Sequence, residues 1–293
     1  MMYLPQGATL HSLPTFIHRS CGARNGALGC IRYYGIAKDR LEPGNPSGQG
    51  AQHLATKFLG GVQSGAELIR HHTLMGLYKP VMCDEWWVNR SVDKIARGAL
   101  QIHGIGSNLI HGPLSWCPDC SREDFGLYGW APWRVLHQVP FAHHCPVHGT
   151  PLLSICALCN EPVGYNFRWR LPGDSCQKCK GNSFRPALVV EKSPGYQRLL
   201  RVLLSLNRAM MSGESLPKIP GLSFPAPQEE ADALSSALDQ LSAEWALSAI
   251  DASIPKLLGV NDRENFIPRS MLSLSLASPL AIVLLTSLLP QFD

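Results

Sequence analysis

The chain has 293 residues and a mass of 32.1 kDa, which is enough for two or three small domains or one large one. Apolar residues make up 45% and charged residues only 16% of it, so the composition excludes wholesale disorder. The net charge of +4 is uneven: residues 1–114 carry +5, residues 115–186 carry +2 and residues 187–293 carry −3. This gradient favours a front part that faces nucleic acid and a rear part that faces protein.

The first fourteen residues contain no basic residue ahead of an apolar run, and Pro5 and Pro14 interrupt them. We therefore expect no secretory signal and a cytoplasmic protein. In that compartment the ten cysteines are expected to stay reduced, with some of them bound to metal, rather than to form disulfides.

Residues 1–114 form the first predicted domain, and their apolar periodicity is helical. A first helix starts near Leu13, residues 23–26 (ARNG) predict a turn, and residues 27–34 predict a second helix. A further pair of helices is predicted over residues 65–77 and 92–102.

The first two of these helices predict a helix-turn-helix-like region, in which arginines lie close to phosphates or bases. The candidate nucleic-acid contacts here are Arg19, Arg24 and Arg32. An ordinary helical hairpin with its arginines in solvent is the alternative.

Residues 115–186 form the second predicted domain, which is rich in Cys, His and Trp. It contains four short knuckles, CPDC at 117–120, CPVH at 145–148, CALC at 156–159 and CQKC at 176–179. Two knuckles complete a tetrahedral shell, and thiolates with at most one imidazole are the donors that zinc prefers. The spacing predicts two structural Zn²⁺ ions per chain, held by Cys117, Cys120, Cys145, His148, Cys156, Cys159, Cys176 and Cys179.

Sequential pairing of the knuckles is the favoured arrangement, because each loop is short enough to close alone. A cross-braced arrangement, an iron–sulfur cluster, and competition from His143 or His144 for the ligand position stay open. All eight positions are filled by protein donors, and no deaminase, HExxH or P-loop signature occurs in the sequence. We therefore expect no enzymatic activity.

Basic residues cluster beside the last two knuckles and could follow a phosphate backbone. These further candidate nucleic-acid contacts are Arg168, Arg170, Lys178 and Lys180. Trp116, Trp130 and Trp133 are expected to form the small core of the metal module instead. For the pair His137 and Gln138 we expect structural hydrogen bonds.

Residues 187–293 form a predicted helical C-terminal region. Ser193-Pro194 is a helix start signal, and Gly213 is the matching stop. A proline-rich linker and a second helix over about residues 229–250 follow. The apolar stretch 271–289 contains Pro279 and favours a buried broken helix over a membrane anchor. The fold class is thus mainly α with a central zinc-ribbon or knuckle module.

The cysteine region contains a series of motifs in a fixed order: WCPDC at 116–120, WAPW at 130–133, HQVP at 137–140 and CPVHGTPL at 145–152. In these motifs it resembles the TniQ/TnsD family of transposition proteins. A further pair of CxxC knuckles follows them, and SLPTFI at 12–17 is similar to the opening helix of the family. The similarity extends over about residues 10–185.

Membership of that family implies an adaptor that selects the target site of a transposon. Its implied partners are an AAA+ ATPase transposition regulator, target DNA or a CRISPR RNA-guided complex, and, indirectly, the transposase. A homodimer is left open, and no membrane contact is expected. The alternative interpretation is a zinc-containing DNA-binding transcriptional regulator.

Overall fold

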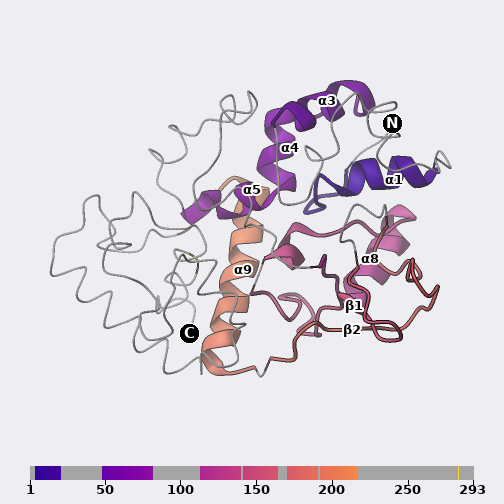
Figure 1. The fold of residues 1–293 in the computed structure, drawn as a ribbon. Coiled ribbons are helices and arrows are strands. Elements are labelled where there is room, and N and C mark those ends of the chain that lie inside the picture. Colours follow the sequence, from indigo (N-terminus) through magenta and orange to yellow (C-terminus); the bar gives the residue numbers. More distant parts are fainter. Residues whose placement is uncertain are drawn as a thin grey trace, which may run out of the picture.

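A computed structural model describes residues 4–20, 48–81, 113–139, 141–163, 170–190 and 192–214, together with Leu216 and Val283. The described part is mostly helical with few strands (Figure 1). Its α-helices are α1 (Ser12–Ser20), α3 (Gly48–Phe58), α4 (Gly65–His72), α5 (Leu74–Tyr78), α8 (Pro118–Tyr128) and α9 (Pro194–Ser212). The 3-10 turns η3 (Lys79–Val81) and η4 (Val135–Gln138) and the strands β1 (Ile155–Cys156) and β2 (Phe184–Arg185) complete it.

The helix predicted over residues 65–77 is two helices, because the chain breaks at Thr73. Helix α4 begins at a capping box, in which Ser64 and Glu67 satisfy each other's backbone N–H groups. Thr73 has an extended backbone, and its hydroxyl donates to the carbonyl of Ile69 while accepting from the N–H of Gly76. A Cβ at Gly76 would overlap the carbonyl oxygen of Arg70. The tight reversal into α5 therefore requires glycine at this position, which the apolar periodicity alone did not reveal.

The N-terminal segment joins the helical part to the cysteine module. The N–H of Thr9 donates to the carbonyl of Trp133 at 2.6 Å, and the N–H of Trp133 donates to the hydroxyl of Ser12 at 2.8 Å. On the other side of the segment, His72 at the end of α4 donates from Nδ1 to the carbonyl of Ala8 at 2.8 Å. These buried bonds connect α1, α4 and the residues around Trp133.

A small aromatic core supports the module. Trp116 lies edge-on to Trp133, with ring centroids 5.9 Å apart, and also to Phe184 of β2 at 5.0 Å. Leu114 and Val163 complete this buried cluster. Trp130 is buried elsewhere, against Phe16 of α1 at 4.5 Å. The prediction of a tryptophan core is confirmed for Trp116 and Trp133, whereas Trp130 attaches the module to α1.

Helix α9 begins and ends where the sequence predicts. The hydroxyl of Ser193 accepts from the N–H of Tyr196, Pro194 occupies the first turn, and Gly213 closes the helix in the left-handed conformation. In Figure 1, α9 passes beside the module that holds β1 and β2 and ends near α5 and α4. Nδ1 of His71 lies 3.0 Å from the carbonyl oxygen of Met210, and this hydrogen bond fixes the C-terminal end of α9.

Several predicted elements lie outside the described residues. They are the turn at 23–26 and the helix at 27–34, which complete the helix-turn-helix-like hairpin, and the helices over 92–102 and 229–250. The linker between residues 217 and 227 and most of the apolar stretch 271–289 lie there as well. Within the described part of the chain, no helix is both long and apolar enough to cross a membrane.

Candidate metal centres

The first knuckle is built on the start of α8. Cys117 is the N-cap residue, and Pro118 occupies the first helical turn, where its missing N–H leaves no backbone partner unsatisfied. Cys120 follows one turn later, and the N–H of Ser121 bonds to the carbonyl of Cys117 at 3.0 Å. The first turn of the helix therefore places both sulfur atoms on one side.

The other three knuckles share one turn geometry. In each, the N–H of the residue four positions after the first cysteine donates to that cysteine's carbonyl, at 2.7 to 2.9 Å. The cysteine N–H in turn donates to the carbonyl five positions on, at 2.7 to 2.9 Å. The fourth residue after the cysteine adopts positive φ, at Gly149 (68°), Asn160 (57°) and Lys180 (62°). This repeated turn directs the two donors of each knuckle to the same side.

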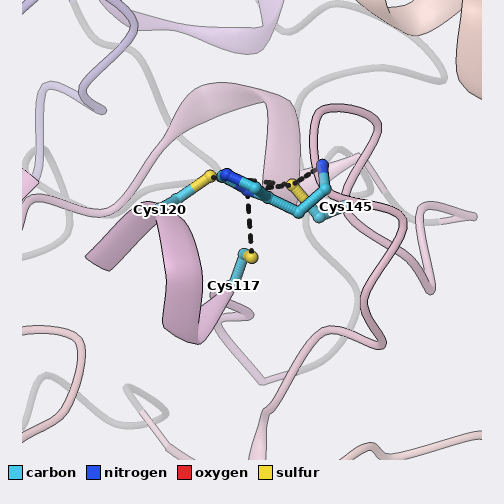
Figure 2. A group of neighbouring side chains, drawn as sticks. Cys117, Cys120 and Cys145 are labelled. Atoms are coloured by element: carbon cyan, nitrogen blue, oxygen red, sulfur yellow. Dashed lines mark hydrogen bonds between the residues drawn. The ribbon is translucent and has the colours of Figure 1, made fainter. Parts of the chain in front are cut away.

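Four donors of the first two knuckles converge on one point. Figure 2 shows Cys117, Cys120 and Cys145 with their sulfur atoms turned toward one another. The Nδ1 atom of His148 lies 3.6 Å from the sulfur of Cys117, 3.3 Å from that of Cys120 and 3.7 Å from that of Cys145. All four ligand atoms lie within 4.8 Å of one another. This first cluster can hold a metal ion, and its imidazole donor is Nδ1.

Three further side chains fix the donors of the first cluster. Glu123 accepts from Nε2 of His148 at 3.0 Å, which directs Nδ1 toward the sulfur atoms. Thr150 places its hydroxyl 3.0 Å from the sulfur of Cys117. His137 is buried, and its Nε2 lies 3.5 Å from the sulfur of Cys145. Burial lowers the pKa of His137 to about 3, so this ring stays neutral at neutral pH.

The last two knuckles form a second cluster of four sulfur atoms. Cys156 and Cys179 lie 3.5 Å apart, as do Cys159 and Cys176, and all four sulfur atoms lie within 4.8 Å of one another. Strand β1 carries Cys156 and pairs antiparallel with β2 through the register Cys156 to Phe184. The structure thus groups the knuckles sequentially, and both clusters could hold metal ions.

The donor set fits zinc. Each cluster offers four donors at tetrahedral spacing, three thiols and an imidazole in one and four thiols in the other. His143 and His144 lie outside the groups of ligand atoms. A Zn²⁺ ion at each site would fix the loops that carry its ligands. Protein side chains would fill all of its four coordination positions.

The residues that carry the first cluster match a known protein family. Residues 30–152 match the model of the TniQ family. The chain contains a TniQ domain. The resemblance to the TniQ family is thereby confirmed, and it connects the chain with target-site selection in transposition. No curated protein matches the chain.

The match ends between the two clusters. The TniQ domain includes all four donors of the first cluster and stops four residues before Cys156. It is therefore narrower than the similarity over residues 10–185 inferred from the motifs. The second cluster and α9 lie beyond the matched range.

The candidate nucleic-acid residues differ in their surroundings. Arg19 forms an ion pair with Asp174, and Lys178 lies 3.7 Å from Glu161. Lys180 is exposed at the positive-φ position of its knuckle, and Arg170 is half-buried and accepts a bond from the Trp133 indole at its backbone carbonyl. Arg24, Arg32 and Arg168 lie outside the described residues.

The side chains that surround the first cluster were not predicted from the sequence. Glu123 follows Cys120 by three residues on α8, so helical spacing would have placed it on the same side. Thr150 and His137 reach their sulfur atoms only through the tertiary fold. Gln138 is structural as expected, since its side-chain amide bonds both the N–H and the carbonyl of Ser115, at 3.2 and 2.8 Å.

Proposed function

We propose that the protein is a non-enzymatic adaptor that selects the target site in DNA transposition. It links target DNA or an RNA-guided complex to an AAA+ ATPase, which in turn engages the transposase. The match of residues 30–152 to the TniQ family carries this proposal. Two Zn²⁺ ions stabilise the module between the two partner-binding regions.

The architecture of the metal clusters supports a structural role. Four protein donors surround each cluster, whereas a catalytic zinc site keeps one position for water or substrate. The first cluster is also enclosed: Cys117, Cys120 and Cys145 are at most 1% exposed. This enclosure supports a structural rather than a catalytic role for an ion held in the first cluster.

The charge gradient supports the assignment of the two partners to different regions of the chain. Residues 1–114 carry a net +5 and suit a nucleic-acid or ribonucleoprotein surface, whereas residues 187–293 carry −3. Like charge repels a phosphate backbone, so the acidic region suits a protein partner better. We assign the AAA+ ATPase contact to the C-terminal region on this ground.

A reconstituted transposition reaction tests the adaptor. Transposase, AAA+ ATPase and donor DNA are incubated with and without the protein, and the insertion positions are mapped. We expect insertions to concentrate at one target only when the protein is present. The protein alone should show no strand transfer. Unchanged insertion positions and frequencies in its absence would contradict the adaptor proposal and favour a DNA-binding transcriptional regulator.

Metal analysis tests the structural module separately. The purified protein should contain two zinc ions per chain, and Cys117→Ser or Cys176→Ser should each reduce the ratio to one. Because the two substitutions affect different clusters, their effects on metal content should add. A folded chain that contains no metal contradicts this part of the proposal.

A further inference from the structure

The two clusters differ in how they are buried. All three cysteines of the first cluster are at most 1% exposed. In the second cluster Cys156 and Cys176 are buried, but Cys159 is half-buried and Cys179 is exposed. A reagent in solution can therefore reach a sulfur atom of the second cluster without any opening of the fold.

The hydrogen bonds to sulfur differ as well. In the first cluster the hydroxyl of Thr150 and the imidazole of His137 lie 3.0 and 3.5 Å from the sulfur atoms of Cys117 and Cys145. Among the described residues, the sulfur atoms of the second cluster are bonded by backbone N–H groups and by one another. Backbone N–H groups reach sulfur in the first cluster as well, so the hydroxyl and the imidazole are what distinguish the first cluster. Such side-chain donors withdraw electron density from a thiolate and reduce its nucleophilicity.

Charge adds to this difference. Three thiolates and an imidazole around Zn²⁺ give a net charge of −1, whereas four thiolates give −2, and the greater electron density makes the sulfur atoms more nucleophilic.

We propose that, among the seven cysteines that the structure describes, Cys179 is the one that soft electrophiles modify first, so that the second cluster loses its metal while the first stays intact. This inference rests on the proposed zinc occupancy. With a maleimide, the thiolate sulfur forms a C–S bond to one alkene carbon, the carbon–carbon π bond breaks, and the other carbon takes a proton from water. No oxidant or leaving group is required, and the alkylated sulfur has lost the negative charge that held the metal.

The experiment uses the full-length, zinc-loaded protein and N-ethylmaleimide at neutral pH. Peptide mass spectrometry follows each cysteine separately, and a chromogenic chelator follows the zinc that is released. We expect Cys179 to be alkylated at least about tenfold faster than Cys117, Cys120 or Cys145. One zinc ion per chain should be released in step with it. The three cysteines outside the knuckles, Cys21, Cys30 and Cys83, lie outside the described residues and are quantified on their own peptides.

Two variants separate reactivity from folding. Cys179→His gives the second cluster the donor set of the first, and it should release its second zinc more slowly than the native chain. Thr150→Val removes the hydroxyl beside Cys117 while keeping the side-chain shape. It should speed alkylation in the first cluster and leave the rate at Cys179 unchanged, which a general loss of stability would not do.

The results decide between the inference and the proposal beneath it. Equal alkylation rates in the two clusters, with two zinc ions bound at the start, overturn the inference alone. Release of both ions in one concerted step does the same. A chain that contains no zinc before treatment overturns both the inference and the proposed metal sites. If the Cys179→His variant does not retain its second zinc ion, the alkylation rates of the individual cysteines in the native chain test the inference on their own.

Discussion

The hydroxyl of Tyr196 accepts hydrogen bonds from the backbone N–H groups of His143 and His144, at 2.8 and 3.1 Å. It also donates to the carbonyl of Phe141 at 3.4 Å. Tyr196 lies in the first turn of α9, beyond the range that matches the TniQ family, while His144 directly precedes the metal-cluster residue Cys145. One phenol therefore connects the C-terminal helix to the loop that carries a metal ligand.

Tyr196→Phe keeps the ring against His144 but leaves the backbone N–H groups of His143 and His144 without their acceptor. We expect it to lower the free energy of unfolding by about 2 kcal/mol, measured by urea denaturation followed by circular dichroism. Tyr128→Phe is the control, because that ring is 45% exposed at the end of α8. An equal effect of the two substitutions would contradict a structural role for the Tyr196 hydroxyl.

A second prediction concerns the ion pair between Asp124 and Arg134. The guanidinium bonds both carboxylate oxygens, at 2.9 and 2.7 Å, and the Asp124 side chain is only 5% exposed. Asp124→Asn leaves the arginine without its counter-charge and should cost about 3 kcal/mol of stability. Asp119→Asn removes the exposed pair with Arg122 from the same helix and should cost less than about 1 kcal/mol. Thermal unfolding of both variants measures the difference.

A third prediction concerns pH. Burial lowers the pKa of His72 from 6.5 to about 4, although the hydrogen bond to Ala8 acts in the opposite direction. Between those values the unfolded chain binds more protons than the folded one, so stability is complete above pH 6.5 and falls toward pH 4. The full loss from this residue is about 3 kcal/mol.

His72→Asn keeps a side-chain N–H near the Ala8 carbonyl but does not titrate. We expect the variant to lose less stability than the native chain when the pH falls from 6.5 to 4. Urea denaturation at several pH values measures this slope, and every other titrating group contributes equally to both proteins. Identical slopes would show that folding does not lower the pKa of His72.

A fourth prediction concerns the carboxylate behind the first cluster. Glu123→Gln weakens the acceptor that orients His148, and we expect the zinc affinity of that cluster to fall about tenfold. Competition with a chelator should show the change in one of the two zinc ions only. Glu161→Gln is the matched control, because its side-chain carboxylate lies 3.7 Å from the ammonium group of Lys178 and the substitution leaves its backbone bonds to the second cluster in place.

The features that the sequence predicts well are those set by local chemistry. The start and end of α9 follow from Ser193, Pro194 and Gly213, and the knuckle spacing places the eight donors in two groups. The break at Thr73 was missed because it depends on the close approach of Gly76 to Arg70, which apolar periodicity does not encode. Thr150 and His137 were missed for a similar reason, since they reach the first cluster through the tertiary fold, from a turn and from η4.

The last prediction concerns the proposed nucleic-acid contact near the second cluster. Lys180 is exposed, whereas Lys178 lies 3.7 Å from Glu161, which offsets part of its charge. Because each phosphate contact releases counterions, Lys180→Gln should weaken duplex DNA binding and reduce the slope of log affinity against log salt by about 1. Lys178→Gln should have a smaller effect on both quantities, because a carboxylate already competes for its charge. Fluorescence anisotropy over a series of salt concentrations measures the affinity and the slope together. If neither lysine changes the slope, while reversal of Arg24 and Arg32 does, then the DNA contact lies in the N-terminal region and not beside the metal module.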